Sequence, residues 1–218
     1  MTIEEKSIKY IKTDQPSGIY FAKGFSVDIK TRSREEIFAA ALECFNKRGY
    51  ADTTISIIAR TAGFSKGGIY HHFKSKRELF LELFLYRVRR YSEQLKSLLH
   101  QEESPEKRLQ IFMKETGILL KKNEDFYRFC LEFLAMGARD TQIRQVMTSF
   151  YKDTLGVFCG IVNDGIDRGK FKPVDSRKVA RIIYFLVMGV FFTSLSVDTD
   201  FDLSDQISFQ TEFLLKGL

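Results

Sequence analysis

Only three prolines and 14 glycines interrupt this chain of 218 residues. Proline breaks a helix because it lacks a backbone N–H, and glycine weakens one because its backbone is unusually free in the unfolded chain. Between these breakers, apolar side chains recur every three or four residues, which places them along one face of a helix. The pattern predicts an all-α protein of about nine helices, three short ones followed by longer ones.

Serine and threonine residues mark where several of these helices should begin. Ser33-x-x-Glu36 and Ser75-x-x-Glu78 each match a capping box, in which side chains satisfy the free N–H groups of a first turn. Ser104 precedes a proline, the residue favoured at the first helical position. Thr53 or Thr54 can cap the second helix, and Ser65 can cap the third. The predicted helices cover roughly residues 33–49, 53 or 54 to 62, 65–73, 75–99, 105–122, 125–138, 142–168, 175–197 and 203–216.

Positive charge is concentrated in the first part of the chain. Residues 1–90 carry 17 basic and 10 acidic side chains, whereas the remaining 128 residues carry 17 basic and 18 acidic ones. A stretch without acidic residues contains five of the basic ones, Arg60, Lys66, Lys74, Lys76 and Arg77. Such a cluster is typical of a surface that binds nucleic-acid phosphates, although a solvated helix face would have the same composition.

Residues 53–80, with the sequence TTISIIARTAGFSKGGIYHHFKSKRELF, have the pattern of a helix-turn-helix, two short helices joined by a turn that contains a glycine. Ala59 is small where the helices would cross, and Gly63 can adopt the positive φ that ends the first helix. The expected inner faces are apolar and consist of Ile58, Ala62, Phe64, Ile69 and Phe73. A generic helical hairpin would also satisfy this spacing.

Residues 33–80 closely resemble the TetR family of bacterial regulators, through the run AALECFNKRGY and the helix-turn-helix segment that follows it. The helix layout of the later residues agrees with the family but carries no motif. The resemblance implies a helix-turn-helix domain (31–77) and a helical domain for ligand binding and dimerisation (78–218), whereas the amino-terminal extension (1–30) departs from the short tail that is usual in the family. The resemblance also implies a homodimeric repressor on a palindromic double-stranded DNA operator, with the recognition helix, Lys66–Phe73, in the major groove.

Matching the family pattern residue by residue gives nine candidate DNA contacts. Those expected to hold phosphates are Thr54, Tyr70, His71, Lys74 and Lys76, and those expected nearest base edges are Ser56, Lys66, Gly67 and Gly68. Lys66 opposes the dipole of the helix that it begins, and a phosphate or a guanine edge would compensate for that. Each glycine costs a helix about 1 kcal/mol relative to alanine. Close approach to DNA would explain both glycines, as would a frayed helix start.

The predicted helix over residues 175–197 is apolar all round, so it needs burial on more than one side. The last predicted helix is also rich in large apolar residues. Together they predict half of an intersubunit four-helix bundle, with Phe191, Phe192, Leu195, Phe209 and Phe213 at the dimer interface. The apolar part of this helix is shorter than the roughly 20 residues of a membrane span and is bracketed by charges, so no membrane partner is predicted.

Aromatic residues at helical spacing between residues 80 and 158 are individually more typical of a core, but as a group they predict an apolar pocket. The candidate ligand-binding residues are Tyr86, Phe112, Thr116, Phe129, Phe133, Phe158, Tyr184 and Met188, and Tyr127 and Thr193 are further polar candidates. The apolar faces contain no acidic cluster that a multiply charged cation would need. The sequence therefore favours a small apolar effector, such as an acyl compound.

Other classes of function lack support in the sequence. No hydrolase, metalloprotease or dinucleotide-binding motif is present, so we predict neither an enzyme nor a cofactor. The adjacent residues His71 and His72 point in different directions on a helix, so no metal site is predicted. Three cysteines without a C-x-x-C pair, and a polar amino terminus without a signal peptide, predict reduced thiols in a cytoplasmic protein. The alternative to a ligand-responsive repressor is a constitutive or architectural helix-turn-helix protein without a ligand.

Overall fold

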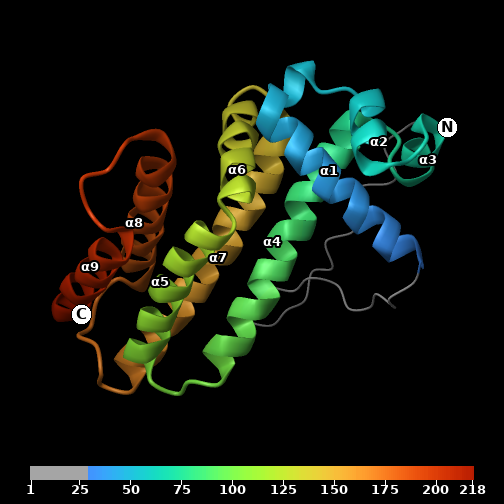
Figure 1. Ribbon diagram of the computed structural model, residues 1–218. Coiled ribbons are helices and arrows are strands. Elements are labelled where there is room, and N and C mark those ends of the chain that lie inside the picture. Colours follow the sequence, from blue (N-terminus) through green and yellow to red (C-terminus); the bar gives the residue numbers. More distant parts are fainter. Residues whose placement is uncertain (1–28) are drawn as a thin grey trace.

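The computed structural model describes residues 29–218, and every regular element in that range is a helix. Figure 1 shows α1, α2 and α3 at one end and the long helix α4 running from them along the rest of the protein. The predicted all-α architecture of nine helices is therefore confirmed for the described range. The helices are α1 (Ile29–Asp52), α2 (Ile55–Ala62), α3 (Lys66–His72), α4 (Lys76–His100), α5 (Pro105–Lys122), α6 (Glu124–Gly137), α7 (Thr141–Asp167), α8 (Ser176–Ser196) and α9 (Leu203–Gly217).

The first helix differs from its prediction at both ends. It begins at Ile29, so Ser33 lies inside the helix and the capping box expected there is wrong. Near its other end Gly49 has φ 72° and ψ 169°, a conformation outside the helical region that glycine adopts without strain from a side chain. The kink at Gly49 turns the chain toward α2. The predicted extension, residues 1–30, lies outside the described residues except for the start of α1.

Four of the later helices begin as the sequence predicts. The hydroxyl oxygens of Thr54, Ser65, Ser75 and Ser104 accept hydrogen bonds from backbone N–H groups three residues ahead, at 3.2, 3.0, 3.0 and 3.3 Å. Each cap satisfies a donor that would have no partner in the first turn. These caps fix the starts of α2, α3, α4 and α5, and so fix the direction in which α3 leaves the turn.

An aromatic cluster joins the amino-terminal helices to the rest of the protein. Phe45 of α1 contacts Phe80 of α4 edge-on, with ring centroids 5.0 Å apart. Phe80 in turn contacts Phe129 of α6 at 4.8 Å, and Phe84 stacks on Phe133 at 4.0 Å. All five rings are buried. The hydrophobic core is therefore continuous from α1 through α4 to α6. A movement of α4 or α6 would consequently displace α1.

The last two helices lie together on the side of the protein away from α2 and α3 (Figure 1). Five large apolar side chains on them are exposed, namely Ile182, Phe185, Phe192, Phe209 and Phe213, and Phe213 is 73% exposed. Among the described helices, α8 alone is long and apolar enough to span a membrane, but a helix covered by protein passes the same test. We refer to these five residues as the α8–α9 apolar face.

Candidate DNA-binding surface and ligand cavity

The crossing of α2 and α3 is fixed by buried side chains and one backbone contact. Ile58, Ile69 and Phe73 are fully buried, and Ala59 is 3% exposed at the crossing, as the sequence predicts. Gly63 has φ 71° and ends α2 in the left-handed conformation. The N–H of the next residue, Phe64, then donates to the Ala59 carbonyl oxygen at 2.9 Å. This is a helix-turn-helix whose second helix is held rigidly against the first.

Eight of the nine predicted DNA contacts lie on α2 and α3 or next to them and form what we call the recognition surface. It consists of Thr54, Ser56, Lys66, Gly67, Gly68, Tyr70, His71 and Lys74, all exposed except the half-buried Gly68. The Lys66 ammonium lies 6.0 Å from the centre of the Tyr70 ring. Tyr70 is 46% exposed, so its hydroxyl can reach an external phosphate. Donors and a cation therefore share one accessible face.

The two glycines of α3 occupy different surroundings. A Cβ atom at residue 67 would meet only the Ser65 hydroxyl oxygen, at 3.9 Å, which is an ordinary contact. At residue 68 it would lie 3.3 Å from the same oxygen, which caps the helix. Packing within the protein therefore favours a small residue at 68 but not at 67. An external molecule that approaches the backbone closely would explain glycine at residue 67.

Lys76, the ninth predicted contact, has a different role in the structure. Its ammonium donates hydrogen bonds to the carbonyl oxygens of Tyr50, Ala51 and Thr53, at 2.6, 3.2 and 2.7 Å. It also lies 4.3 Å from the centre of the Tyr50 ring, and burial lowers its pKa. All three N–H donors are thus used inside the protein. In this arrangement Lys76 ties the end of α1 to the start of α4, and its contact with a phosphate stays a prediction.

Arg77 also binds within the protein, although it belongs to the predicted basic cluster. One of its terminal nitrogens donates to both carboxylate oxygens of Asp140, each at 2.7 Å, and Nε donates to one of them at 3.2 Å. This hydrogen bonding lowers the pKa of Asp140, which also caps α7 by accepting from Gln142 and Ile143. The ion pair joins the start of α4 to the start of α7.

Helix α6 also contacts the carboxy-terminal end of α1. Asn46 donates to the Asp125 carbonyl oxygen at 2.8 Å, and the backbone N–H of Tyr50 donates to the Glu132 carboxylate. The centroids of the Phe45 and Phe129 rings lie 6.0 Å apart between these two contacts. The kinked end of α1 is therefore attached along most of one face of α6.

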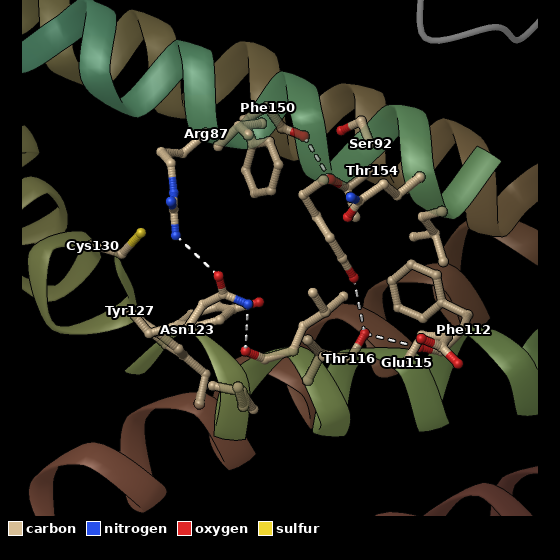
Figure 2. Close-up of a pocket in the computed structure, with 18 of the residues that line it drawn as sticks. Arg87, Ser92, Phe112, Glu115, Thr116, Asn123, Tyr127, Cys130, Phe150 and Thr154 are labelled. Atoms are coloured by element: carbon tan, nitrogen blue, oxygen red, sulfur yellow. Dashed lines mark hydrogen bonds between the residues drawn. The ribbon is translucent and has the colours of Figure 1, made fainter. Parts of the chain in front are cut away.

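A cavity of about 870 Å³ lies between α4, α5, α6, α7 and α8. Figure 2 shows side chains from several helices converging on it, including Phe112, Thr116 and Phe150. Most of the lining is apolar, and the volume is in the range of small-molecule sites. The structure brings five of the eight predicted ligand residues to this cavity, namely Phe112, Thr116, Phe158, Tyr184 and Met188.

The other three predicted ligand residues lie elsewhere. Phe129 and Phe133 belong to the aromatic cluster between α1, α4 and α6. The hydroxyl of Tyr86 donates to the Glu35 carboxylate of α1, outside the cavity. Their helical spacing is the same as that of the lining residues, and only tertiary packing separates the two groups. Of the further polar candidates, Tyr127 lines the cavity, whereas Thr193 is exposed and does not.

Phe191 requires a correction as well. It was predicted at the dimer interface, but it is 5% exposed, lines the cavity and lies 5.4 Å from the Tyr127 ring. Its neighbour Phe192 points outward, as does Phe213 on α9. An apolar helix without a polar face gives no sequence signal for which side meets its own domain and which side is exposed.

Sequence reasoning placed the polar residues Thr116, Tyr127 and Tyr184 in a pocket, but it missed others that line the cavity, among them Arg87, Tyr91 and Asn123. Arg87 of α4 donates to the side-chain oxygen of Asn123 at 3.0 Å, and its guanidinium lies 5.1 Å from the centre of the Phe126 ring. Farther along, the hydroxyls of Tyr91 and Thr116 are 3.2 Å apart. Burial lowers the pKa of Arg87 and raises that of Tyr91. Arg87 lies among other basic residues of α4, a pattern that resembles a solvated face.

Comparison with known families matches nearly the whole described chain. Residues 37–83 match the model of the tetR family of bacterial regulatory proteins, and residues 84–217 match that of the YsiA-like carboxy-terminal region. The chain belongs to the tetR family. It is therefore a DNA-binding transcriptional regulator with a ligand-binding carboxy-terminal domain, and the resemblance found in the helix-turn-helix segment is confirmed.

Individual relatives are similar over most of their length. The fatty acid metabolism regulator protein of Bacillus subtilis is 24% identical over 184 residues, which cover 84% of this chain and 94% of that protein. The fatty acid degradation regulator FadR of Bacillus halodurans has a TM-score of 0.77 at 22% identity and covers 90% of this chain and 98% of its own. FadR of B. subtilis, solved with stearoyl-CoA, has a TM-score of 0.75 at 24% identity, with 84% and 98% covered.

Proposed function

We propose that this protein is a cytoplasmic transcriptional repressor that a long-chain acyl effector releases from a palindromic operator. The cavity carries the proposal, because about 870 Å³ of largely apolar space lies between the helices that also hold the DNA-binding end. A long hydrocarbon chain would bury its surface against Phe112, Phe158 and Met188. The complex of a relative with stearoyl-CoA supports this chemical class.

On the DNA side, we assign the recognition surface to the operator. Thr54, Tyr70, His71 and Lys74 would hold phosphates, which gives affinity without reading sequence. Ser56, Lys66, Gly67 and Gly68 would lie nearest base edges in the major groove. We give Lys76 a positioning role, since its ammonium already bonds three carbonyl oxygens. The helix-turn-helix domain remains assigned to residues 31–77.

The α8–α9 apolar face is the proposed dimer interface. Soluble proteins rarely expose a continuous apolar patch of this kind unless another surface covers it. Two copies related by a two-fold axis would bury Phe192, Phe209 and Phe213, with the half-buried Leu195 beside them, and form a four-helix bundle. The same axis would present two recognition helices to one palindromic site.

Helix α6 is placed to connect the two functions. Tyr127 and Cys130 line the cavity, whereas Phe129 and Glu132 of the same helix contact α1. An effector that displaces α6 and α4 would therefore move α1 and change the separation of the two recognition helices. A preference of about 3 kcal/mol for the non-binding arrangement would weaken DNA affinity by more than about a hundredfold.

The test begins with operator duplexes selected by the full-length protein from genomic fragments. Fluorescence anisotropy then measures their affinity with and without palmitoyl-CoA, and a scrambled duplex serves as the control. We expect the acyl compound to weaken operator binding about a hundredfold and to leave the weak binding to the scrambled duplex nearly unchanged. Operator affinity that stays the same with acyl compounds of every chain length would favour the constitutive repressor instead.

A further inference from the structure

One cation in the cavity has no acidic partner. Arg87 is half-buried, and among residues 29–218 no aspartate or glutamate forms an ion pair with it. Its nearest partners are the neutral Asn123 amide and the face of the Phe126 ring. A guanidinium has five N–H donors, and a charge removed from water is costly unless an anion compensates for it. Arg87 thus has donors left for a ligand.

The surroundings of Arg87 hold it in position. Asn123 donates its side-chain N–H to the Leu119 carbonyl oxygen at 3.2 Å, so its side-chain oxygen is turned toward the guanidinium. Figure 2 shows Arg87, Asn123, Tyr127 and Cys130 grouped at one end of the cavity. Burial raises the pKa of Tyr127, so its hydroxyl remains protonated and can donate to an acceptor at neutral pH.

The other charged residues that line the cavity are Arg90, Lys96, Glu115 and Lys122, and none of them forms an ion pair with Arg87. Arg90, one turn along α4, lies 3.5 Å from the Glu35 carboxylate and donates to the Tyr86 hydroxyl. Glu115 lines the cavity too, but Figure 2 places it near Phe112 and Thr116, away from Arg87. The end near Arg87 is therefore positive, and the space beyond it is largely apolar.

We infer that Arg87, supported by Asn123 and Tyr127, is a binding site for the anionic head group of an amphipathic effector whose hydrocarbon chain fills the rest of the cavity. The inference rests on the proposed function only in taking this cavity as the effector site. A carboxylate and a phosphate present the same chemistry to a guanidinium, namely paired anionic oxygens that accept two N–H bonds. A cationic amphiphile would instead place two positive charges together.

The experiment compares four ligands that share a twelve-carbon chain: laurate, lauroyl-CoA, dodecanol and dodecyltrimethylammonium, each below its micellar concentration. Calorimetry measures their binding to the full-length wild type, to Arg87→Met and to Arg128→Met. Methionine keeps an apolar side chain of similar length without the charge. Arg128 is the matched control, because it lies on the exposed side of α6 and pairs with Glu124.

We expect at least one anionic ligand to bind the wild type more tightly than dodecanol does. Arg87→Met should weaken the binding of that ligand about 10- to 100-fold, which is the usual contribution of hydrogen bonds to a charged group. It should leave dodecanol binding unchanged. Arg128→Met should change the binding affinity of neither ligand. If laurate alone is weakened, the anion is the carboxylate, and if lauroyl-CoA alone is weakened, it is a phosphate of coenzyme A.

Two results would overturn the inference while leaving the cavity as an effector site. In the first, Arg87→Met binds the anionic ligands as tightly as the wild type does. In the second, the wild type binds the cationic ligand as tightly as the anionic ones. A purely structural Arg87 would lower the melting temperature of Arg87→Met and weaken all four ligands alike, which also contradicts the inference. If no ligand binds the wild type, both the inference and the proposed effector class are wrong.

Discussion

The recognition surface consists of mostly exposed residues from about 20 consecutive positions, whereas the cavity is lined by side chains from five helices. At the recognition surface Tyr70 and Lys66 can change without disturbing a core. In the cavity Phe112 and Phe158 pack on each other with ring centroids 4.6 Å apart. A substitution there that alters ligand binding therefore also alters stability. DNA binding and folding should therefore separate under mutation, whereas effector binding and folding should not separate at the packed apolar residues of the cavity.

The largest expected effect on operator affinity comes from a change outside both regions, on the α8–α9 apolar face. Phe213→Glu places a charge on the α8–α9 apolar face, far from the recognition surface (Figure 1). Loss of the dimer removes simultaneous binding of two half-sites, so operator affinity should fall about 100-fold or more. Light scattering should show a monomer, and circular dichroism should show that its helix content is unchanged. A dimer that binds the operator normally would show that the interface lies elsewhere.

Lys76→Met sharpens the comparison, because Lys76 lies next to the recognition surface in sequence but is used inside the protein. Losing its three hydrogen bonds to the carbonyl oxygens of Tyr50, Ala51 and Thr53 should lower the free energy of unfolding by about 2 kcal/mol. Urea denaturation measures this loss directly. The salt dependence of DNA binding should keep its slope, since no phosphate contact is removed. Unchanged stability together with a slope reduced by about one would restore the phosphate role.

Tyr70→Phe removes one hydroxyl from an exposed side chain. The unfolding free energy should stay the same, whereas DNA affinity should fall by about 1 kcal/mol for each half-site, the usual worth of one hydrogen bond. Because a phosphate contact carries no sequence information, operator and scrambled duplexes should be weakened alike. Anisotropy titrations on both duplexes measure this. A loss confined to the operator would place Tyr70 at a base edge.

Gly67→Ala should change the free energy of unfolding only slightly, and with the sign opposite to that of Lys76→Met. A Cβ atom fits at this position with an ordinary contact, so alanine should stabilise α3 by somewhat less than about 1 kcal/mol. Operator binding should nevertheless weaken, because the added methyl group would meet the DNA. Gly156→Ala is a matched control, since it adds a methyl group to α7 in open space. Equal DNA affinities for both variants would mean that α3 does not approach DNA closely at residue 67.

These two regions also differ in how well the sequence predicts them. The helix-turn-helix could be predicted because its signals are local, such as the caps at Thr54 and Ser65 and the positive φ of Gly63. The full lining of the cavity could not be predicted, since Phe158 lines it while Phe133 does not, although both belong to amphipathic helices. Which face of α6 or α8 meets the cavity depends on crossing angles that no short segment encodes.

Charged residues were the hardest to place from sequence. Arg77 and Lys76 contribute to a basic cluster in the sequence, but in the structure they bond to Asp140 and to α1. Arg87 lies among basic neighbours yet points toward the cavity, where it contacts Asn123. A long side chain can reach several partners from one backbone position, so its partner is decided by the fold and not by its neighbours in sequence.

The central claim is that occupation of the cavity and binding of the operator weaken each other. Linkage requires that two coupled sites affect each other by the same factor. Calorimetry of palmitoyl-CoA binding to the free dimer and to the operator-bound dimer therefore tests the claim most directly. We predict that the operator weakens effector binding by the factor by which the effector weakens operator binding, about a hundredfold. Equal effector affinities in the two titrations would contradict the account.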